Sequence, residues 1–159
     1  MNDQNDAAKV RVFPPAVPLI VIFLGLALHW AWPISSSFQA YTPGRYWLGA
    51  VIVLGAILGL GFWSVLLVRR NGQSENPWKP THFIEERGPF SLTRNPMYLQ
   101  MVLVCIGVGV GLANVWVLIL TPIGIWALQR LAILPEEAYL EAKFGEAYLS
   151  YKSRVRRWI

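Results

Sequence analysis

Two stretches of the sequence gather the side chains that could take part in chemistry. The first, residues 69–97, ends in Arg94-Asn95-Pro96-Met97. Asn95 suits a helix N-cap and Pro96 suits the first helical position, so a helix is predicted to begin at Pro96. A helix N-terminus presents free N–H groups and a positive dipole end, which suit a carboxylate or another anion. The stretch is either a well-capped helix start or an anion site built on one.

The second stretch, residues 135–159, begins with Pro135-Glu136-Glu137. Proline followed by two acidic residues is typical of a helix start, because the carboxylates complement the helix dipole. Just before it, Arg130 lies in the end of an apolar segment, where an arginine needs a partner or a path to the membrane surface. Glu137 follows Arg130 by two helical turns, so we expect the two to pair or to contact a ligand together.

The rest of the second stretch has apolar side chains at helical spacing. Leu140, Phe144, Tyr148 and Tyr151 would share one face, and charged residues take the other. This pattern predicts an amphipathic helix over residues 135–159 that lies at the cytoplasmic interface or folds back over the bundle.

The composition places these stretches in a membrane protein. Of 159 residues, 55% are hydrophobic and only 14% are charged, and the mean hydropathy is +0.41. Soluble domains carry roughly 25% charged residues, so a soluble enzyme, a disordered tail and a nucleic-acid-binding module are all disfavoured. The lone Cys105 excludes an internal disulfide, and His29 and His82 are too far apart in sequence to suggest a metal site.

Four apolar segments are candidates to cross the membrane, for which about 20 mostly apolar residues are needed. They are residues 16–32, 46–68, 97–113 and 115–134, and a break at Asn114 makes the last two a helical hairpin. We therefore predict an all-α membrane protein of one domain, residues 1–159, with about four transmembrane helices. Residues 1–15 would be a tail, and residues 69–97 a cytoplasmic motif segment.

The charges predict the orientation of these helices. With both termini in the cytoplasm, every Lys and Arg except Arg45 lies on the cytoplasmic side, as the positive-inside rule requires. The basic excess is then a topology signal and a contact with membrane lipids, not with nucleic acid. Ser35 to Ser37 form a weak signal-cleavage site, but Trp32 and Pro33 precede it, so we favour an uncleaved first helix.

The two stretches together resemble a known group of enzymes. The run Gly88-Pro89-Phe90-x-x-x-Arg94-Asn95-Pro96-x-Tyr98-Leu99 is followed by Glu136-Glu137-x-x-Leu140-x-x-x-Phe144-Gly145-x-x-Tyr148. This order resembles the integral-membrane methyltransferases of the isoprenylcysteine carboxyl methyltransferase and phospholipid methyltransferase group. The resemblance covers roughly residues 76–157.

The resemblance implies S-adenosylmethionine as cofactor, held in a pocket on the cytoplasmic side. It implies that Arg130 orients the acceptor, and the candidate catalytic residues are Arg130 and Glu137. The cofactor would contact residues from both stretches, namely His82, Arg94, Asn95, Pro96, Tyr98, Leu99, Glu136, Glu137, Tyr148 and Arg154.

The implied reaction is methyl transfer to a lipidic or hydrophobic acceptor, such as the carboxylate of an isoprenylcysteine-like molecule. Asn95-Pro96-Met97-Tyr98 also resembles the phospholipid N-methyltransferases, which makes an amine acceptor the alternative. A hypothesis of another class is a non-catalytic membrane accessory protein on the same scaffold.

Overall fold

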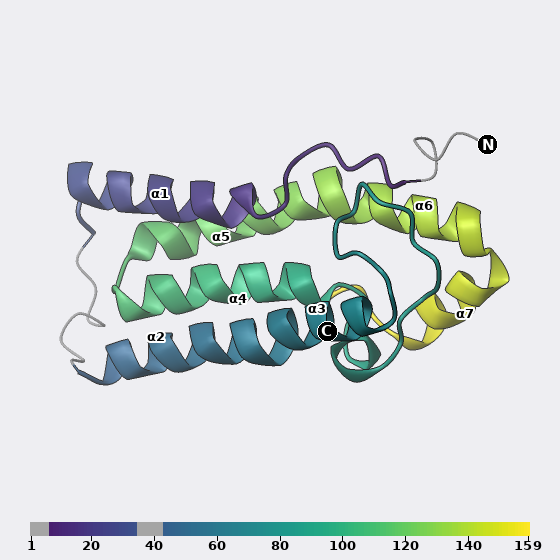
Figure 1. The fold of residues 1–159 in the computed structure, drawn as a ribbon. Coiled ribbons are helices and arrows are strands. Elements are labelled where there is room, and N and C mark those ends of the chain that lie inside the picture. Colours follow the sequence, from purple (N-terminus) through teal and green to yellow (C-terminus); the bar gives the residue numbers. More distant parts are fainter. Residues whose placement is uncertain (1–6, 35–42) are drawn as a thin grey trace.

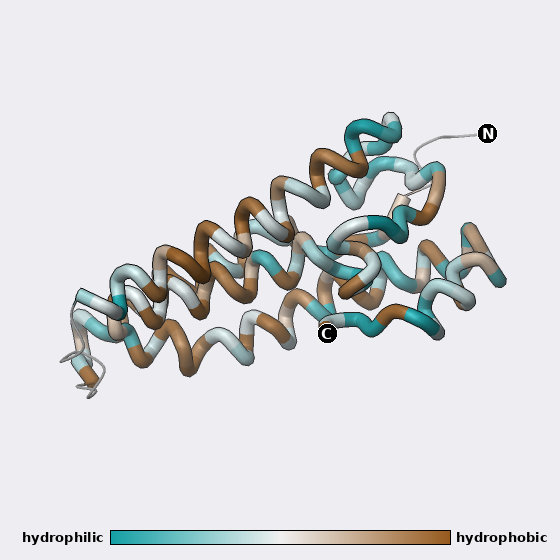
Figure 2. Tube along the Cα trace, turned by 90° about the horizontal axis from the view of Figure 1, so that it is seen from below, coloured by the Kyte–Doolittle hydropathy of each residue, from teal (hydrophilic) through white to brown (hydrophobic). Residues whose placement is uncertain are grey.

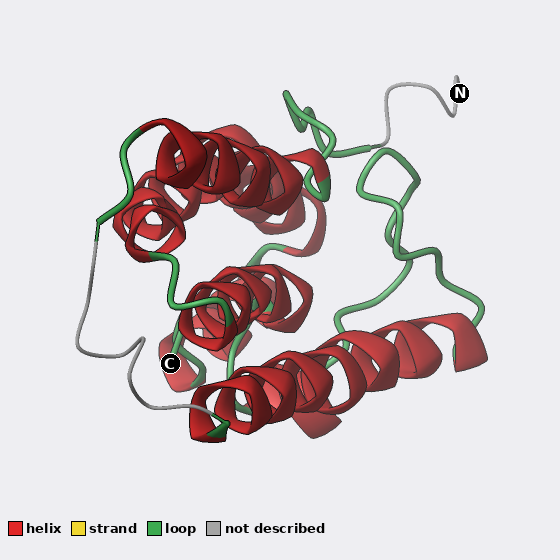
Figure 3. Ribbon diagram, turned by 90° about the vertical axis from the view of Figure 1, so that its left-hand side faces the viewer, coloured by secondary structure: helices red, strands yellow, loops and turns green. Residues whose placement is uncertain are grey.

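The computed structural model describes residues 7–34 and 43–159, and within these ranges every regular element is a helix (Figure 3). The predicted all-helical class is therefore confirmed for this part of the chain. Residues 1–6 of the predicted tail and the weak cleavage site at Ser35 to Ser37 lie outside the described residues. The elements are α1 (Ala16–Ala31), α2 (Gly44–Gly55), η3 (Ala56–Phe62), α3 (Trp63–Arg70), η4 (Gly88–Ser91), α4 (Pro96–Gly111), α5 (Val115–Leu128), η5 (Gln129–Ile133), α6 (Leu134–Phe144) and α7 (Glu146–Arg154).

Several of these elements join end to end into long helices. The π-helical η3 links α2 to α3, giving one helix over Gly44–Arg70, and the π-helical η5 links α5 to α6 over Val115–Phe144. Both are long and apolar enough to cross a membrane, whereas α1 and α4 are shorter apolar helices of 16 residues each. The predicted fourth segment ends at residue 134, but the helix continues through Pro135.

The continuation past Pro135 is possible because another part of the chain supplies the missing donor. Proline has no N–H to give to the carbonyl four residues earlier, which is that of Leu131. The backbone N–H of Arg11 donates to this carbonyl at 2.9 Å. The N-terminal segment, residues 7–15, is thereby attached to the helix that it crosses.

The long and short helices form an antiparallel bundle in which α4 contacts α1, α2 and α5 (Figures 1 and 3). Glycine allows the closest approach: a Cβ on Gly49 would stand 2.6 Å from the carbonyl oxygen of Gly107. The hairpin between α4 and α5 turns at Asn114, as predicted, and the Asn114 side chain accepts a hydrogen bond from the Val117 N–H at 3.1 Å.

One end of the bundle carries the polar parts of the chain (Figure 2). The N-terminal segment, the connection between α3 and α4, the helices α6 and α7 and the C-terminus all gather there (Figure 1). The predicted single helix over residues 135–159 is divided in the structure. The chain reverses at Gly145, where φ is +51°, so α7 and the residues after it fold back towards the start of α4.

Candidate functional site

A buried cluster of charges joins the two stretches at this polar end. The Glu137 Oε1 atom accepts hydrogen bonds from Arg94 Nη2 at 2.8 Å and from Arg157 Nε at 3.0 Å, and Glu137 Oε2 accepts one from Arg157 Nη2 at 2.7 Å. Glu137 is 4% exposed, and hydrogen bonding to it raises the pKa of Arg157. Two guanidinium groups thus fully engage the Glu137 carboxylate.

Residues 93–95 also hold the C-terminal segment through its backbone carbonyls. Arg94 Nη1 donates to the Val155 oxygen at 2.6 Å and to the Lys152 oxygen at 3.1 Å. The side chains of Thr93 and Asn95 both donate to the Arg157 oxygen, at 2.9 and 3.0 Å. The helix α4 begins at Pro96 as predicted, but the Asn95 side chain binds the C-terminal segment and forms no cap hydrogen bond.

Glu136, next to Glu137, has a different environment. Its Oε2 atom accepts a hydrogen bond from the Tyr98 hydroxyl at 2.8 Å. Within residues 7–34 and 43–159, no Lys, Arg or His forms an ion pair with it. The site therefore contains one carboxyl group that is paired with two arginines and one that is hydrogen-bonded to a tyrosine hydroxyl.

Two cavities meet at Glu136. The smaller, of about 100 Å³, has both polar and apolar lining residues, with Tyr148 and Tyr151 among them, and burial raises the pKa of both tyrosines. The larger, of about 580 Å³, is mostly apolar. It extends between α4, the C-terminal part of the long helix Gly44–Arg70 and the N-terminal segment. The residues that line both cavities form the shared wall: Glu75, Asn76, Pro77, Phe90, Arg94, Asn95, Met97 and Glu136.

The strap, residues 73–85, lines part of both cavities. The Gln73 side-chain oxygen accepts hydrogen bonds from the N–H groups of His82 at 2.6 Å and Phe83 at 3.1 Å. At the other end, the buried Glu85 carboxylate accepts from Asn71 Nδ2 at 2.6 Å and from Arg87 Nε at 2.8 Å. The hydrogen bond from Arg87 holds the pKa of Glu85 below its ordinary value, against the opposing effect of burial.

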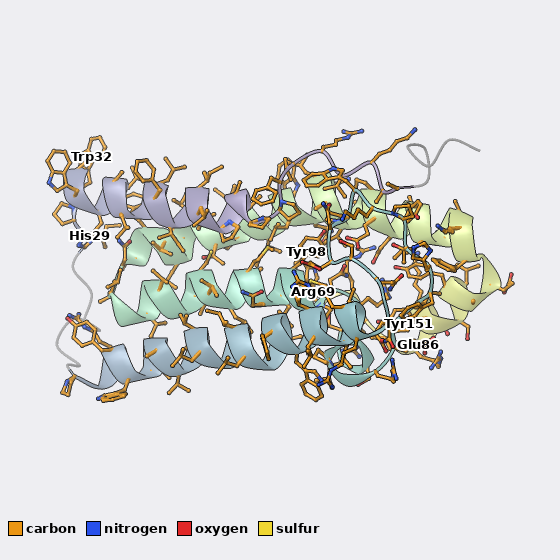
Figure 4. All side chains as sticks on the ribbon, viewed as in Figure 1. His29, Trp32, Arg69, Glu86, Tyr98 and Tyr151 are labelled. Atoms are coloured by element: carbon orange, nitrogen blue, oxygen red, sulfur yellow. The ribbon has the colours of Figure 1, made fainter. Side chains whose placement is uncertain are left out.

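The structure brings most of the predicted site residues to the cavities. Arg94, Asn95, Pro96, Tyr98, Glu136, Glu137 and Tyr148 line one or both of them. Three predicted cofactor-binding residues line neither cavity: His82 is exposed, Arg154 binds Glu86 at the surface at 2.9 Å, and Leu99 is half-buried on α4. Figure 4 shows Tyr98, Tyr151 and Glu86 towards the polar end, far from His29 and Trp32.

The predicted pairing of Arg130 with Glu137 is not present. Arg130 is exposed in η5 and lines neither cavity, and Glu137 binds Arg94 and Arg157 instead. Sequence reasoning missed Arg157, because it belongs to a basic C-terminal run that topology already explained. It also missed Phe13 and Trp78, which line the larger cavity.

Comparisons with known proteins identify a family and two related sequences. A family model described as phospholipid methyltransferase matches residues 44–147. An uncharacterized protein of Haemophilus influenzae is 38% identical over 63 residues, which are 40% of this chain and all of that protein. The protein-S-isoprenylcysteine O-methyltransferase of Schizosaccharomyces pombe is 26% identical over 124 residues, 77% of this chain and 49% of that enzyme. The chain thus matches about half the length of the yeast enzyme, and no solved structure matches it.

Proposed function

Because the chain belongs to the phospholipid methyltransferase family, we propose that it is a membrane enzyme that transfers a methyl group from S-adenosylmethionine to a lipidic acceptor. The family resemblance inferred from the two motif stretches is confirmed. The observation that carries the proposal is the pair of cavities, one of mixed polar and apolar lining and one mostly apolar, with Glu136 in their shared wall.

Methyl transfer needs this kind of arrangement. The nucleophile must approach the methyl carbon in line, at near-contact distance, in a site that excludes water. The smaller cavity, which has charged and polar side chains in its lining, suits the cofactor, and the neighbouring, mostly apolar cavity suits a lipidic acceptor. The reacting groups would meet at the shared wall, near Asn95 and Glu136.

The residues present fit the cofactor. When bound, S-adenosylmethionine supplies an electrophilic methyl carbon on a positively charged sulfur. The Glu136 carboxylate has no cationic partner among the described residues and would stabilise that positive charge or the ammonium group. The buried Arg94 Nε–H has no hydrogen-bond partner in the described part of the chain, which leaves a donor for the cofactor's carboxylate.

The size of the smaller cavity limits how the cofactor can bind. Its volume of about 100 Å³ is below the roughly 300–1,000 Å³ of typical ligand pockets. The cofactor would therefore extend into the larger cavity or displace the strap outwards. Movement of the strap requires that its hydrogen bonds at Gln73 and Glu85 open. The hydrogen bonds that Trp78 donates to the Val10 carbonyl and that the Thr81 N–H donates to the Tyr139 hydroxyl must open as well.

Glu137 has a positioning role in this proposal. Its carboxylate is engaged by Arg94 and Arg157, so it fixes α6 against the start of α4 and leaves the neighbouring Glu136 to face the cavities. The predicted role of Arg130 in orienting the acceptor stays a prediction.

The lining of the larger cavity favours an amine over a carboxylate as acceptor. Arg94 is the one cation among its described lining residues. It is bound to Glu137 and two carbonyls, and its remaining Nε–H would serve the cofactor's carboxylate. A carboxylate acceptor would face Glu136 without a counter-ion. An amine acceptor would be attracted by an ionised Glu136, which would accept the proton that the amine must lose.

In the membrane, we propose that α1 and α4 span together with the two longer helices. The aromatic residues at one end of the bundle support this arrangement, because Trp30, Trp32 and Trp47 are exposed there, as in an interfacial aromatic belt. The opposite end carries most of the Lys and Arg residues. The cavities would thus open on the cytoplasmic side.

Transfer of a tritiated methyl group tests the proposed function. We expect the purified protein in detergent micelles to label phosphatidylethanolamine in preference to N-acetyl-S-farnesylcysteine, and Glu136→Gln to lower the rate at least tenfold. Glu146→Gln, at an exposed site on α7, is the control. No labelled product from either acceptor or from a total lipid extract would favour the accessory-protein hypothesis.

A further inference from the structure

The N-terminal segment, residues 7–15, is a fixed part of the fold. Ala8 and Val10 are 4% and 8% exposed and belong to the same apolar cluster as Tyr98 and Ile133. Between them and α1, the Arg11 N–H satisfies the Leu131 carbonyl that Pro135 leaves open. The segment therefore stays in place as a wall of the molecule.

This wall is connected to the strap through Trp78. The Trp78 Nε1–H donates to the Val10 carbonyl oxygen at 3.1 Å. The Phe13 and Trp78 rings are stacked, with centroids 6.2 Å apart and planes inclined by 13°. The Phe13 carbonyl accepts the first hydrogen bond of the α1 turn, from Ala16 at 2.9 Å, so the ring has a defined position relative to α1.

Both rings line the apolar cavity that also reaches the shared wall. Phe13 is 60% exposed and Trp78 is 42% exposed, whereas Asn95 and Tyr98 of the same cavity are buried. The cavity therefore passes from a buried polar part to an exposed aromatic part. An acceptor whose reacting group lies beside Glu136 would have its apolar tail against the two rings.

We propose that Phe13 and Trp78 are specificity-determining residues that limit the length of the acceptor's apolar tail. The inference rests on the proposed function, which assigns the larger cavity to the acceptor. Phe13 lies outside the residues that match the family model, 44–147. Acceptor selection would thus depend in part on a residue outside the matched region.

The test measures the chain-length preference of the cavity without requiring turnover. The protein in micelles is photolabelled with an octadecyl chain carrying a diazirine, and decyl, tetradecyl and octadecyl alcohols compete for the site. We expect Phe13→Ala to shift the preference towards the longer alcohols by about tenfold, since each methylene in an apolar pocket changes binding by such factors. Phe13→Trp should shift it towards the shorter ones.

Phe23→Ala is the matched control, because Phe23 lies on α1, is 71% exposed and lines neither cavity. Trp78→Phe keeps a ring but removes the hydrogen bond to Val10, which separates the effect of the ring from that of the connection. If Phe13→Ala does not fold, Phe13→Leu reduces the side-chain volume less and should give a smaller shift in the same direction.

The inference is overturned if Phe13→Ala keeps the wild-type order of competitors, as Phe23→Ala should, or if no alcohol competes with the wild-type label. An unchanged order of competitors would mean that the Phe13 and Trp78 rings only anchor the protein at the membrane interface. Calorimetry with S-adenosylmethionine separates this failure from that of the proposed function. A shifted length preference without cofactor binding supports the aromatic wall and refutes the methyltransferase, whereas cofactor binding with an unshifted preference does the opposite.

Discussion

Glu136 and Glu137 are neighbours in the chain, but their side chains lie in different environments. The Glu137 carboxylate is buried between Arg94 and Arg157. Removing its charge would leave the two arginines without their counter-ion. Glu136 accepts one hydrogen bond from Tyr98 and faces both cavities. At the scale of single residues, we thus attribute stability to Glu137 and ligand contact to Glu136.

Glu137→Gln should therefore destabilise the protein by about 3 kcal/mol, the lower end of the range for a broken buried ion pair, because Arg157 is partly exposed. Denaturant unfolding in detergent measures this change. Glu141→Gln is the control, since Glu141 pairs with Lys152 at the surface and should cost less than about 1 kcal/mol. A fully stable Glu137→Gln that has lost cofactor binding would return Glu137 to the cofactor site.

Adjacent residues of this kind show what the sequence alone does and does not determine. It identified both glutamates as members of a site, because the motif that contains them is continuous. It paired Glu137 with Arg130 by assuming one α-helical register between them. The π-helical η5 changes that register, and Arg130 is exposed as a result.

At the scale of elements, the position of the strap depends on the titratable carboxylate of Glu85, which accepts hydrogen bonds from Asn71 and Arg87. The pKa of Glu85 is lowered in the folded protein, chiefly by the Arg87 hydrogen bond, so the ionised form favours the closed strap. This contribution is complete above the ordinary pKa of 4.5 and is lost as the pH falls through the lower, folded value.

Acidification should therefore loosen the strap before the bundle unfolds. Limited proteolysis within residues 73–85 should accelerate as the pH falls below the ordinary glutamate pKa of 4.5 and through the lower, folded value. Mass spectrometry of the fragments produced by an acid-active protease measures this. Glu85→Gln, which lacks the charge, should be cleaved faster than wild type at neutral pH and show little further change on acidification. Equal acid sensitivity in wild type and Glu85→Gln would remove Glu85 from this role.

The contact between α2 and α4 depends on glycine. A Cβ at Gly49 would stand 2.6 Å from the Gly107 oxygen, whereas a Cβ at Gly59 of the same long helix meets nothing within 4 Å. Gly49→Ala should cost about 1–3 kcal/mol through overpacking, whereas Gly59→Ala should be neutral or stabilising. Thermal unfolding of the two variants side by side tests this, and equal stabilities would show that the helices separate without cost.

At the scale of the whole molecule, the apolar segments were the most predictable part. Their bounds follow from local hydrophobicity, so residues 16–32 and 97–113 correspond closely to Ala16–Ala31 and Pro96–Gly111. Residues 7–15 of the predicted tail instead pack against the bundle, and the chain reverses at Gly145 within the predicted C-terminal helix. Both features depend on contacts between distant parts of the chain, such as the Thr93 and Asn95 bonds to the Arg157 carbonyl, which no local pattern encodes.

The central claim is that the site at Glu136, where the two cavities meet, holds S-adenosylmethionine. Isothermal calorimetry of the detergent-purified protein with S-adenosylmethionine tests it most directly, with Glu136→Gln and the surface control Glu146→Gln in parallel. The account predicts binding by wild type and Glu146→Gln and at least tenfold weaker binding by the folded Glu136→Gln. Folded wild-type protein that binds no S-adenosylmethionine, with or without phosphatidylethanolamine in the micelles, would contradict it.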